Sequence, residues 1–113
     1  MEVSFNGISE QVVSFIGTNV EIGDLVMISG NGKVSKALSD LDIIGMCVTK
    51  RDDLVGVLLH GAIEVGYSGS SAPNLGMEEL VTAGSNLVKV SSGGRLYLVV
   101  STDITSKKVT ILL

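Results

Sequence analysis

Side chains able to do acid–base chemistry are scarce in this chain, and His60 is its only histidine. A histidine acts as a general base when a nucleophile or an orienting carboxylate lies within hydrogen-bond reach. Glu64 stands on the same face of the predicted strand, but four residues of straight strand place it about 13 Å away. Ser68 follows Gly66 and Tyr67, which is not the Gly-x-Ser-x-Gly spacing of a hydrolase nucleophile. We therefore expect His60 to be a dispensable surface residue and the chain not to be an enzyme.

Acidic residues cluster at two places where carboxylates could bind a hard cation, Asp40 with Asp42 and Asp52 with Asp53. A calcium loop surrounds its ion with many oxygen ligands from one tight turn, and neither cluster supplies that pattern. A zinc site draws on several cysteine and histidine ligands, whereas the chain has one residue of each kind. We expect solvated turns at both clusters and no bound metal.

Glycine-rich turns and a turn lysine complete the set of candidate sites. Ser92-Gly-Gly94 could cradle an anion through backbone N–H groups, but it lacks the Gly-Lys-Ser/Thr ending of a phosphate loop, and we expect a hairpin turn there. Lys33 lies at a predicted hairpin, as the modified lysine of biotin and lipoyl carriers does, but Gly32 and Val34 flank it instead of the carriers' Met-Lys-Met or Asp-Lys-Ala. The sequence therefore predicts no catalytic, cofactor-binding or metal-ligating residue.

The segment around His60 has the pattern of a β-strand rather than of a reaction site. Side chains alternate between the two faces of a strand, and one face of residues 54–69 is apolar. Its members are Val55, Val57, Leu59, Ile63, Val65 and Tyr67. A straight strand of this length would run about 45 Å, beyond the usual length, so we expect a bulge or bend at Gly61.

Short apolar runs separated by turn residues fill the rest of the chain. The Asn31-Gly32 pair predicts a hairpin with positive φ at both central residues. Residues 68–74 read as a loop, and residues 76–83 fit either a helical turn or an extended crossing. The other expected strands cover Val3–Phe5, Val12–Ile16, Leu25–Ile28, Lys33–Ala37, Ile43–Lys50, Leu87–Val90, Arg95–Ser101 and Lys108–Leu113.

These runs predict an all-β fold, a small antiparallel β-barrel or sandwich built from short hairpins with little or no helix. We expect residues 17–113 to form a single β-barrel domain and residues 1–16 to form an N-terminal arm or strand. The sole cysteine, Cys47, lies in an apolar run and is expected to be a buried structural thiol. The expected core comprises Val26, Ile28, Val48, Val57, Leu59, Val65, Leu98, Val100, Val109 and Ile111.

Composition excludes several classes of partner. The net charge of −4 disfavours binding to phosphate backbones, and two tyrosines and two phenylalanines provide no stacking platform for single-stranded nucleic acid. No apolar run reaches the length of a membrane span, and the N-terminus lacks the regions of a signal peptide. Apolar residues make up 45% of the chain and charged residues 18%, which favours a homo-oligomer that buries the excess apolar surface.

The segments that carry a family resemblance are short and anchored by glycines. They are Val20–Val26, Gly32–Val34, Ile43–Gly45, Val57–Val65 with its central Gly61, Tyr67–Gly69, Gly94–Val100 and Lys108–Leu113. Read in this order, they resemble the small head proteins of tailed bacteriophages and prophages, the capsid decoration or cement proteins. The resemblance covers about residues 17–113, and residues 1–16 have no counterpart.

The resemblance implies a non-enzymatic protein of the virion head surface, made in the host bacterial cytoplasm. Such a protein binds the assembled lattice of the major capsid protein and strengthens it against the pressure of the packaged DNA. Related head proteins often occupy local threefold positions, which implies a homotrimer, and no catalytic residues carry over. The alternatives are a generic bacterial β-barrel that binds a ligand or serves in assembly, and an enzyme of unrecognised type.

Overall fold

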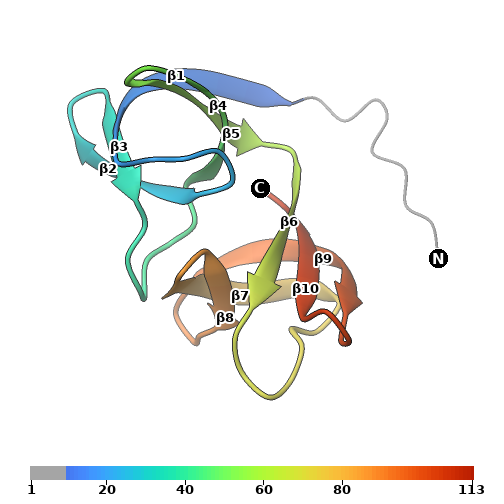
Figure 1. Ribbon diagram of the computed structural model, residues 1–113. Helices are drawn as coiled ribbons and strands as arrows, with labels where there is room; N and C mark the ends of the chain where they lie inside the picture. Colours follow the sequence, from blue (N-terminus) through green and yellow to red (C-terminus); the bar gives the residue numbers. More distant parts are fainter. Residues whose placement is uncertain (1–9) are drawn as a thin grey trace.

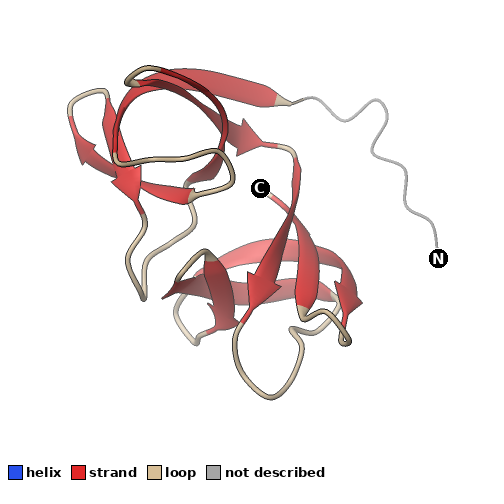
Figure 2. Cartoon of the chain, viewed as in Figure 1, coloured by secondary structure: helices blue, strands red, loops and turns tan. Residues whose placement is uncertain are grey.

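The computed structural model describes residues 10–113, and Figure 2 shows only strands and connecting loops in this part of the chain. The prediction of an all-β fold is confirmed. Residues 76–83, which fitted two structures, form a strand. The strands are β1 (Gln11–Thr18), β2 (Leu25–Gly30), β3 (Lys33–Lys36), β4 (Gly45–Arg51), β5 (Leu54–His60), β6 (Ala62–Tyr67), β7 (Gly76–Gly84), β8 (Leu87–Val90), β9 (Arg95–Asp103) and β10 (Lys108–Leu112).

The strands form two closed sheets, which we call barrel 1 (β1–β5) and barrel 2 (β6–β10). Their strand orders are β1-β3-β2-β4-β5 and β10-β6-β8-β7-β9. Figure 1 shows one barrel above the other, joined where β5 runs into β6. The boundary that we expected between residues 16 and 17 falls inside β1, and the expected single barrel is divided between two closed sheets. The predicted strand at Val3–Phe5 lies outside the described residues.

The two barrels repeat the same pairing pattern. The first and third strands of each barrel pair in parallel, β1 with β3 and β6 with β8, and every other neighbouring pair is antiparallel. The β2–β3 and β7–β8 hairpins even share a register shift, between Ile28 and Gly30 in one and between Thr82 and Gly84 in the other. Barrel 2 is therefore a structural repeat of barrel 1.

The hairpin at Asn31-Gly32 forms as predicted, but its turn differs. Of the two central residues only Gly32 has a positive φ, 66°. The prediction for Asn31 is wrong because the bulge at the end of β2 supplies the strand twist that a turn with two left-handed residues would otherwise provide.

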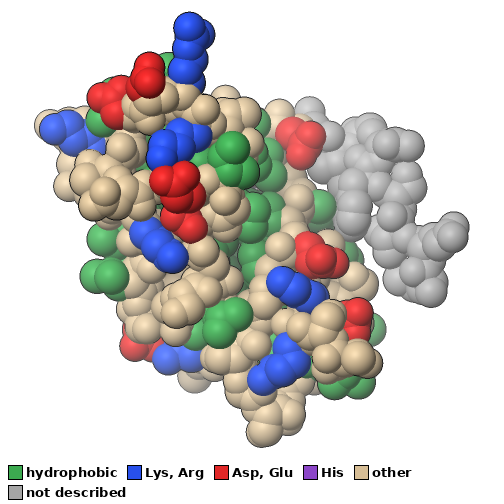
Figure 3. Space-filling model, viewed as in Figure 1, with side chains coloured by type: hydrophobic (Ala, Val, Ile, Leu, Met, Phe, Trp, Pro, Cys, Tyr) green, Lys and Arg blue, Asp and Glu red, His purple; other side chains and the backbone are tan. Residues whose placement is uncertain are grey.

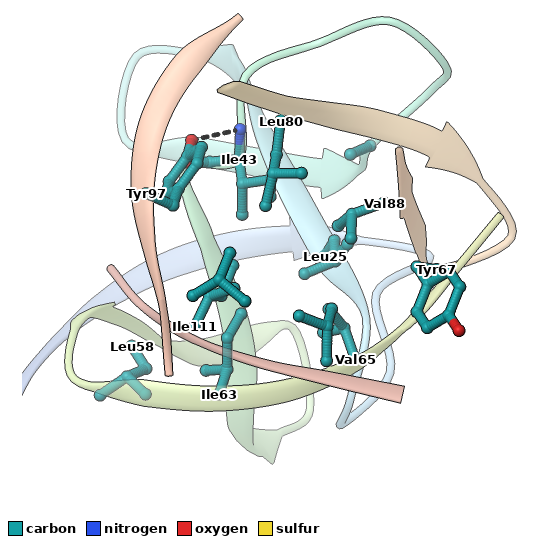
Figure 4. Packing of buried hydrophobic residues seen from close by; sticks show 13 residues of the cluster. Leu25, Ile43, Leu58, Ile63, Val65, Tyr67, Leu80, Val88, Tyr97 and Ile111 are labelled. Atoms are coloured by element: carbon teal, nitrogen blue, oxygen red, sulfur yellow. Dashed lines mark hydrogen bonds between the residues drawn. The ribbon is translucent and has the colours of Figure 1, made fainter. Parts of the chain in front are cut away.

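Buried side chains form two clusters, one confined to barrel 1 and one shared by both barrels. The interior of barrel 1 contains Val20, Val26, Val34, Cys47, Val55 and Val57. The larger cluster fills barrel 2 and also takes in Leu25, Ala37, Ile43 and Leu58 from the part of the chain that forms barrel 1. In Figure 4, Leu25 lies among Val65, Leu80 and Val88. The barrels are thus joined through a common core.

The bend predicted at Gly61 is confirmed, and it divides the expected apolar face between the two clusters. Gly61 has a φ of 137° and separates β5 from β6. Val55 and Val57 lie in the interior of barrel 1, whereas Ile63, Val65 and Tyr67 lie in the larger cluster. The C-terminus returns to this junction, where the backbone N–H of Leu113 donates to the Gly61 carbonyl at 2.8 Å.

The expected core is correct at five positions and wrong at two. Ile28 is 52% exposed and Leu98 is 38% exposed. Leu98 points outward because its neighbours Tyr97 and Val99 fill barrel 2, and Ile28 lies beside the bulge that ends β2. The buried positions are Val26, Val57, Val65, Val109 and Ile111, and the half-buried positions are Val48, Leu59 and Val100.

Candidate binding surface

The residues considered for acid–base chemistry do not converge. His60 is exposed at the end of β5, where it pairs with Gln11 of β1, and Glu64 is exposed on β6. The prediction of a surface histidine is confirmed. Among residues 10–113, no three His, Cys, Asp or Glu side chains come together as a metal-binding group.

Asp40 and Asp42 make contacts between the barrels. Asp40 forms an ion pair with Lys89 of β8 at 2.6 Å, and Asp42 accepts a hydrogen bond from the Arg95 backbone N–H at 3.3 Å. Asp52 occupies the left-handed position of the β4–β5 turn, with a φ of 55°. These carboxylates therefore take part in turns and barrel contacts.

The Ser91–Gly94 turn is occupied by a carboxylate of the protein itself. The Gly93 N–H donates to Glu79 Oε2 at 2.6 Å, and the Gly94 N–H donates to the Ser91 carbonyl at 3.0 Å. An anion brought to this turn would have to displace Glu79. The interpretation of this segment as a hairpin turn is wrong, because the strands that it joins, β8 and β9, both pair with β7 and lie on opposite edges of it.

Cys47 is fully buried in barrel 1, as predicted. Its Sγ lies 3.3 Å from the Thr49 carbonyl, to which the thiol donates. Burial raises the pKa of the Cys47 thiol, and the negative charge of Asp24 raises it further. A thiol held in its neutral form is a poor nucleophile, so Cys47 acts as a packing residue.

Polar contacts fix the position of one barrel on the other. The buried Asp24 accepts from the Glu21 backbone N–H at 2.9 Å and from Asn86 Nδ2 at 2.8 Å, while Asn86 Oδ1 accepts from the Leu25 N–H at 3.1 Å. Thr82 of β7 accepts from the Leu41 N–H at 3.0 Å and also donates to the Leu38 carbonyl. Because these contacts accompany a shared core, the two barrels present their outer surfaces as one rigid body.

One apolar surface lies on the outside of barrel 1, over β1 and β5. Ile16 and Leu54 are cross-strand partners, 39% and 46% exposed, and Val12 is 51% exposed on the same face of β1. Gly56 lies between them, where a Cβ atom would collide with Thr49 Oγ1 and stand 3.1 Å from Val12. We call Val12, Ile16 and Leu54 the β1–β5 surface.

A second apolar surface lies on the outside of barrel 2. Met77 of β7 is 60% exposed and pairs directly with Leu98 of β9, and Leu98 pairs with the half-buried Leu112 of β10. Leu96 is exposed one outward position further along β9. We call Met77, Leu96, Leu98 and Leu112 the β7–β9 surface. Figure 3 shows one face of the molecule, with hydrophobic side chains exposed between the charged groups of the two barrels.

Alternation in the sequence does not locate either surface. On β9 both faces are apolar, Leu96 and Leu98 on one and Tyr97 and Val99 on the other, so alternation alone does not say which face points inward. The signal that could have identified the inward face was Tyr97. A buried tyrosine hydroxyl needs hydrogen-bond partners, and a tertiary contact provides them.

Comparison of the chain with family models, curated proteins and solved structures found no match. Within residues 10–113 there is also no helix of the length and hydropathy that a membrane crossing requires.

Proposed function

We propose that the chain is a non-enzymatic structural protein of a tailed-phage or prophage head, which binds the assembled capsid lattice and stabilises it as a decoration or cement protein. It would be made in the bacterial cytoplasm and act on the virion head surface as a homotrimer. The observation that carries the proposal is the pair of separate apolar surfaces on one rigid two-barrel body.

A rigid body with two contact surfaces suits a protein that acts by spanning its partners. Exposed apolar side chains at a surface centre supply binding energy when a partner excludes water from them. A rigid scaffold loses little conformational entropy on binding. In the proposal, the β1–β5 surface faces the capsid lattice and the β7–β9 surface joins copies of the chain.

Joining copies multiplies the affinity for an assembled lattice. A trimer would present its β1–β5 surfaces together, so that each contact after the first becomes effectively intramolecular and avidity rises by about 10²–10⁴. Unassembled capsid subunits offer only one contact at a time. A ligand that binds only the assembled shell also raises the shell's thermal stability in proportion to its occupancy.

The direct test is co-sedimentation with purified heads of the encoding phage or prophage, compared with its unassembled capsid protein. We expect binding to heads at least about 100-fold tighter than binding to free subunits, together with a higher melting temperature of the decorated heads. Leu54→Glu should weaken head binding because it puts a charge into the β1–β5 surface. His60→Ala is the control, since His60 is exposed at the opposite end of β5 from Leu54.

Equal binding to heads and subunits, or binding to neither, would remove the decoration hypothesis. The generic bacterial β-barrel that binds a ligand or serves in assembly would then take its place. Loss of head binding in His60→Ala but not in Leu54→Glu would show that a different surface faces the lattice.

A further inference from the structure

Each barrel carries the same outward-facing apolar row across equivalent strands. In barrel 1 the row is Leu25 of β2, Met46 of β4 and Leu58 of β5, joined by the pairs Leu25↔Met46 and Met46↔Leu58. In barrel 2 the row runs across β7, β9 and β10 as Met77, Leu98 and Leu112, joined by Met77↔Leu98 and Leu98↔Leu112.

Both rows point away from the barrel that carries them. Leu25, Met46 and Leu58 alternate along their strands with the interior residues Val26, Cys47 and Val57. Leu98 and Leu112 alternate in the same way with interior residues of barrel 2, Val99 and Ile111. The rows therefore lie on equivalent strands and on the same outward face of the repeat. They differ in one respect, since Met77 lies five residues before Thr82 on β7 whereas Leu25 lies three residues before Ile28 on β2.

The two rows differ in what covers them. The row of barrel 1 packs against barrel 2, which leaves Leu25 1% and Leu58 4% exposed and Met46 half-buried against the same cluster. The row of barrel 2 is left open by the described residues, with Met77 60% and Leu98 38% exposed. Within the chain, barrel 2 covers the row of barrel 1, but no described residue covers the corresponding row of barrel 2.

The hairpin of barrel 1 that corresponds to the covering hairpin of barrel 2 is exposed as well. Barrel 2 reaches barrel 1 partly through its β7–β8 hairpin, where Thr82 binds the Leu38–Leu41 segment and Asn86 binds the Leu25 N–H. Thr82 pairs with Val88 in the hairpin of barrel 2, and Ile28 pairs with Val34 in the hairpin of barrel 1. Ile28 therefore occupies the position equivalent to Thr82. Thr82 is buried, whereas Ile28 is a large apolar residue that is 52% exposed.

We propose that a second copy of this chain completes the series, with the β2–β3 hairpin around its Ile28 covering the Met77, Leu98 and Leu112 row of the first copy. The contact continues the barrel-to-barrel interface already present within each chain. It is head-to-tail, because the two sides use different surfaces, and such a contact closes into a ring when the rotation between copies permits. The proposed trimer would be one such ring, but the contact itself requires no capsid.

Light scattering coupled to size exclusion at micromolar concentration tests the contact on the full chain. We expect the wild type to elute as an assembly larger than the 11.7 kDa monomer. Ile28→Glu and Leu98→Glu should each weaken self-association by about tenfold or more, because either charge removes one side of the same interface. Ile104→Glu is the matched control, since Ile104 is 75% exposed in the β9–β10 turn, away from both sides.

Mixing the two variants separates a head-to-tail contact from a symmetric one. Ile28→Glu keeps an intact row and Leu98→Glu keeps an intact hairpin, so an equimolar mixture should form a dimer of twice 11.7 kDa. A wild type that is monomeric throughout, assembly unaffected by Ile28→Glu, or a mixture that stays monomeric would overturn the proposal. Circular dichroism of each variant shows whether the fold survives, and a substitution to Ser replaces any that unfolds. Head binding by a monomeric wild type would overturn this contact and leave the decoration proposal standing.

Discussion

The hydroxyl of Tyr97 in barrel 2 satisfies both backbone groups of Ile43 in the connection between β3 and β4. The Ile43 N–H donates to the hydroxyl at 2.9 Å, and the hydroxyl donates to the Ile43 carbonyl at 2.8 Å. Figure 4 shows the first of these bonds at the edge of the shared core. A side chain of the second barrel thereby takes the place of a strand partner for a buried residue of the first half of the chain.

Replacing Tyr97 with Phe should destabilise the protein by about 1–3 kcal/mol, because the Ile43 N–H and carbonyl would remain buried without partners. Urea unfolding at neutral pH measures the change. Tyr67→Phe is the matched control, since the Tyr67 ring is also buried but its hydroxyl points away from the cluster in Figure 4. A loss as large in Tyr67→Phe would indicate that ring packing rather than hydrogen bonding sets the effect.

Alkaline pH should weaken the fold through the same residue. Burial raises the pKa of Tyr97 above its ordinary value, so the folded state favours the neutral hydroxyl. This contribution is fully present below about pH 10, the unfolded value, and is lost as the pH rises through the folded pKa.

Urea midpoints measured between about pH 8 and 11 should therefore fall, and fall less steeply in Tyr97→Phe. Both proteins should also carry Cys47→Ala, because the raised pKa of the Cys47 thiol likewise makes the urea midpoint fall as the pH rises. Parallel pH profiles in the two proteins would contradict the assignment to Tyr97.

Leucines on the two faces of barrel 2 should respond differently to truncation. Leu80 is fully buried, so Leu80→Ala should cost about 2–5 kcal/mol through lost transfer energy and a cavity. Leu98→Ala removes a side chain that is 38% exposed, and we expect less than about 1 kcal/mol in the monomer. Thermal or urea unfolding at low protein concentration compares them, and equal losses would place Leu98 in the core after all.

Gly45 should not tolerate even a methyl group. A Cβ atom there would collide with the Leu58 carbonyl and lie 2.7 Å from Val57 Cγ1, so Gly45→Ala should cost about 1–3 kcal/mol through overpacking. At Gly30 the nearest atom to a new Cβ is 3.5 Å away, on the flexible Lys33 side chain. Gly30→Ala is therefore expected to be close to neutral, and a similar loss of stability in both variants would contradict the role assigned to close packing.

The two barrels should unfold together in one transition. Leu25, Ile43 and Leu58 come from the part of the chain that forms barrel 1 but lie in the cluster that fills barrel 2, so barrel 2 loses part of its core without them. Calorimetry checks this through the ratio of calorimetric to van't Hoff enthalpy, which should be close to unity. Two resolved transitions would show that the barrels are independent domains.

Local patterns in the sequence were sufficient to predict most of the strands in residues 10–113. Alternation and glycine placement predicted the bend at Gly61, the hairpin at Gly32 and the strand character of residues 95–101. Burial of Cys47 also followed from its apolar neighbours. These features depend on backbone conformation and on residues near in the chain, so a single sequence contains the information that specifies them.

Only the tertiary structure decided which apolar face is inside and which is left on the surface. Leu98 and Val99 are equally apolar, and Tyr97 turns Val99 inward because its hydroxyl reaches Ile43, 54 residues away in the chain. Closure into two barrels and the exposure of Ile28 depend likewise on long-range pairing. Alternation defines two faces of a strand, but the partner that buries one of them lies elsewhere in the sequence.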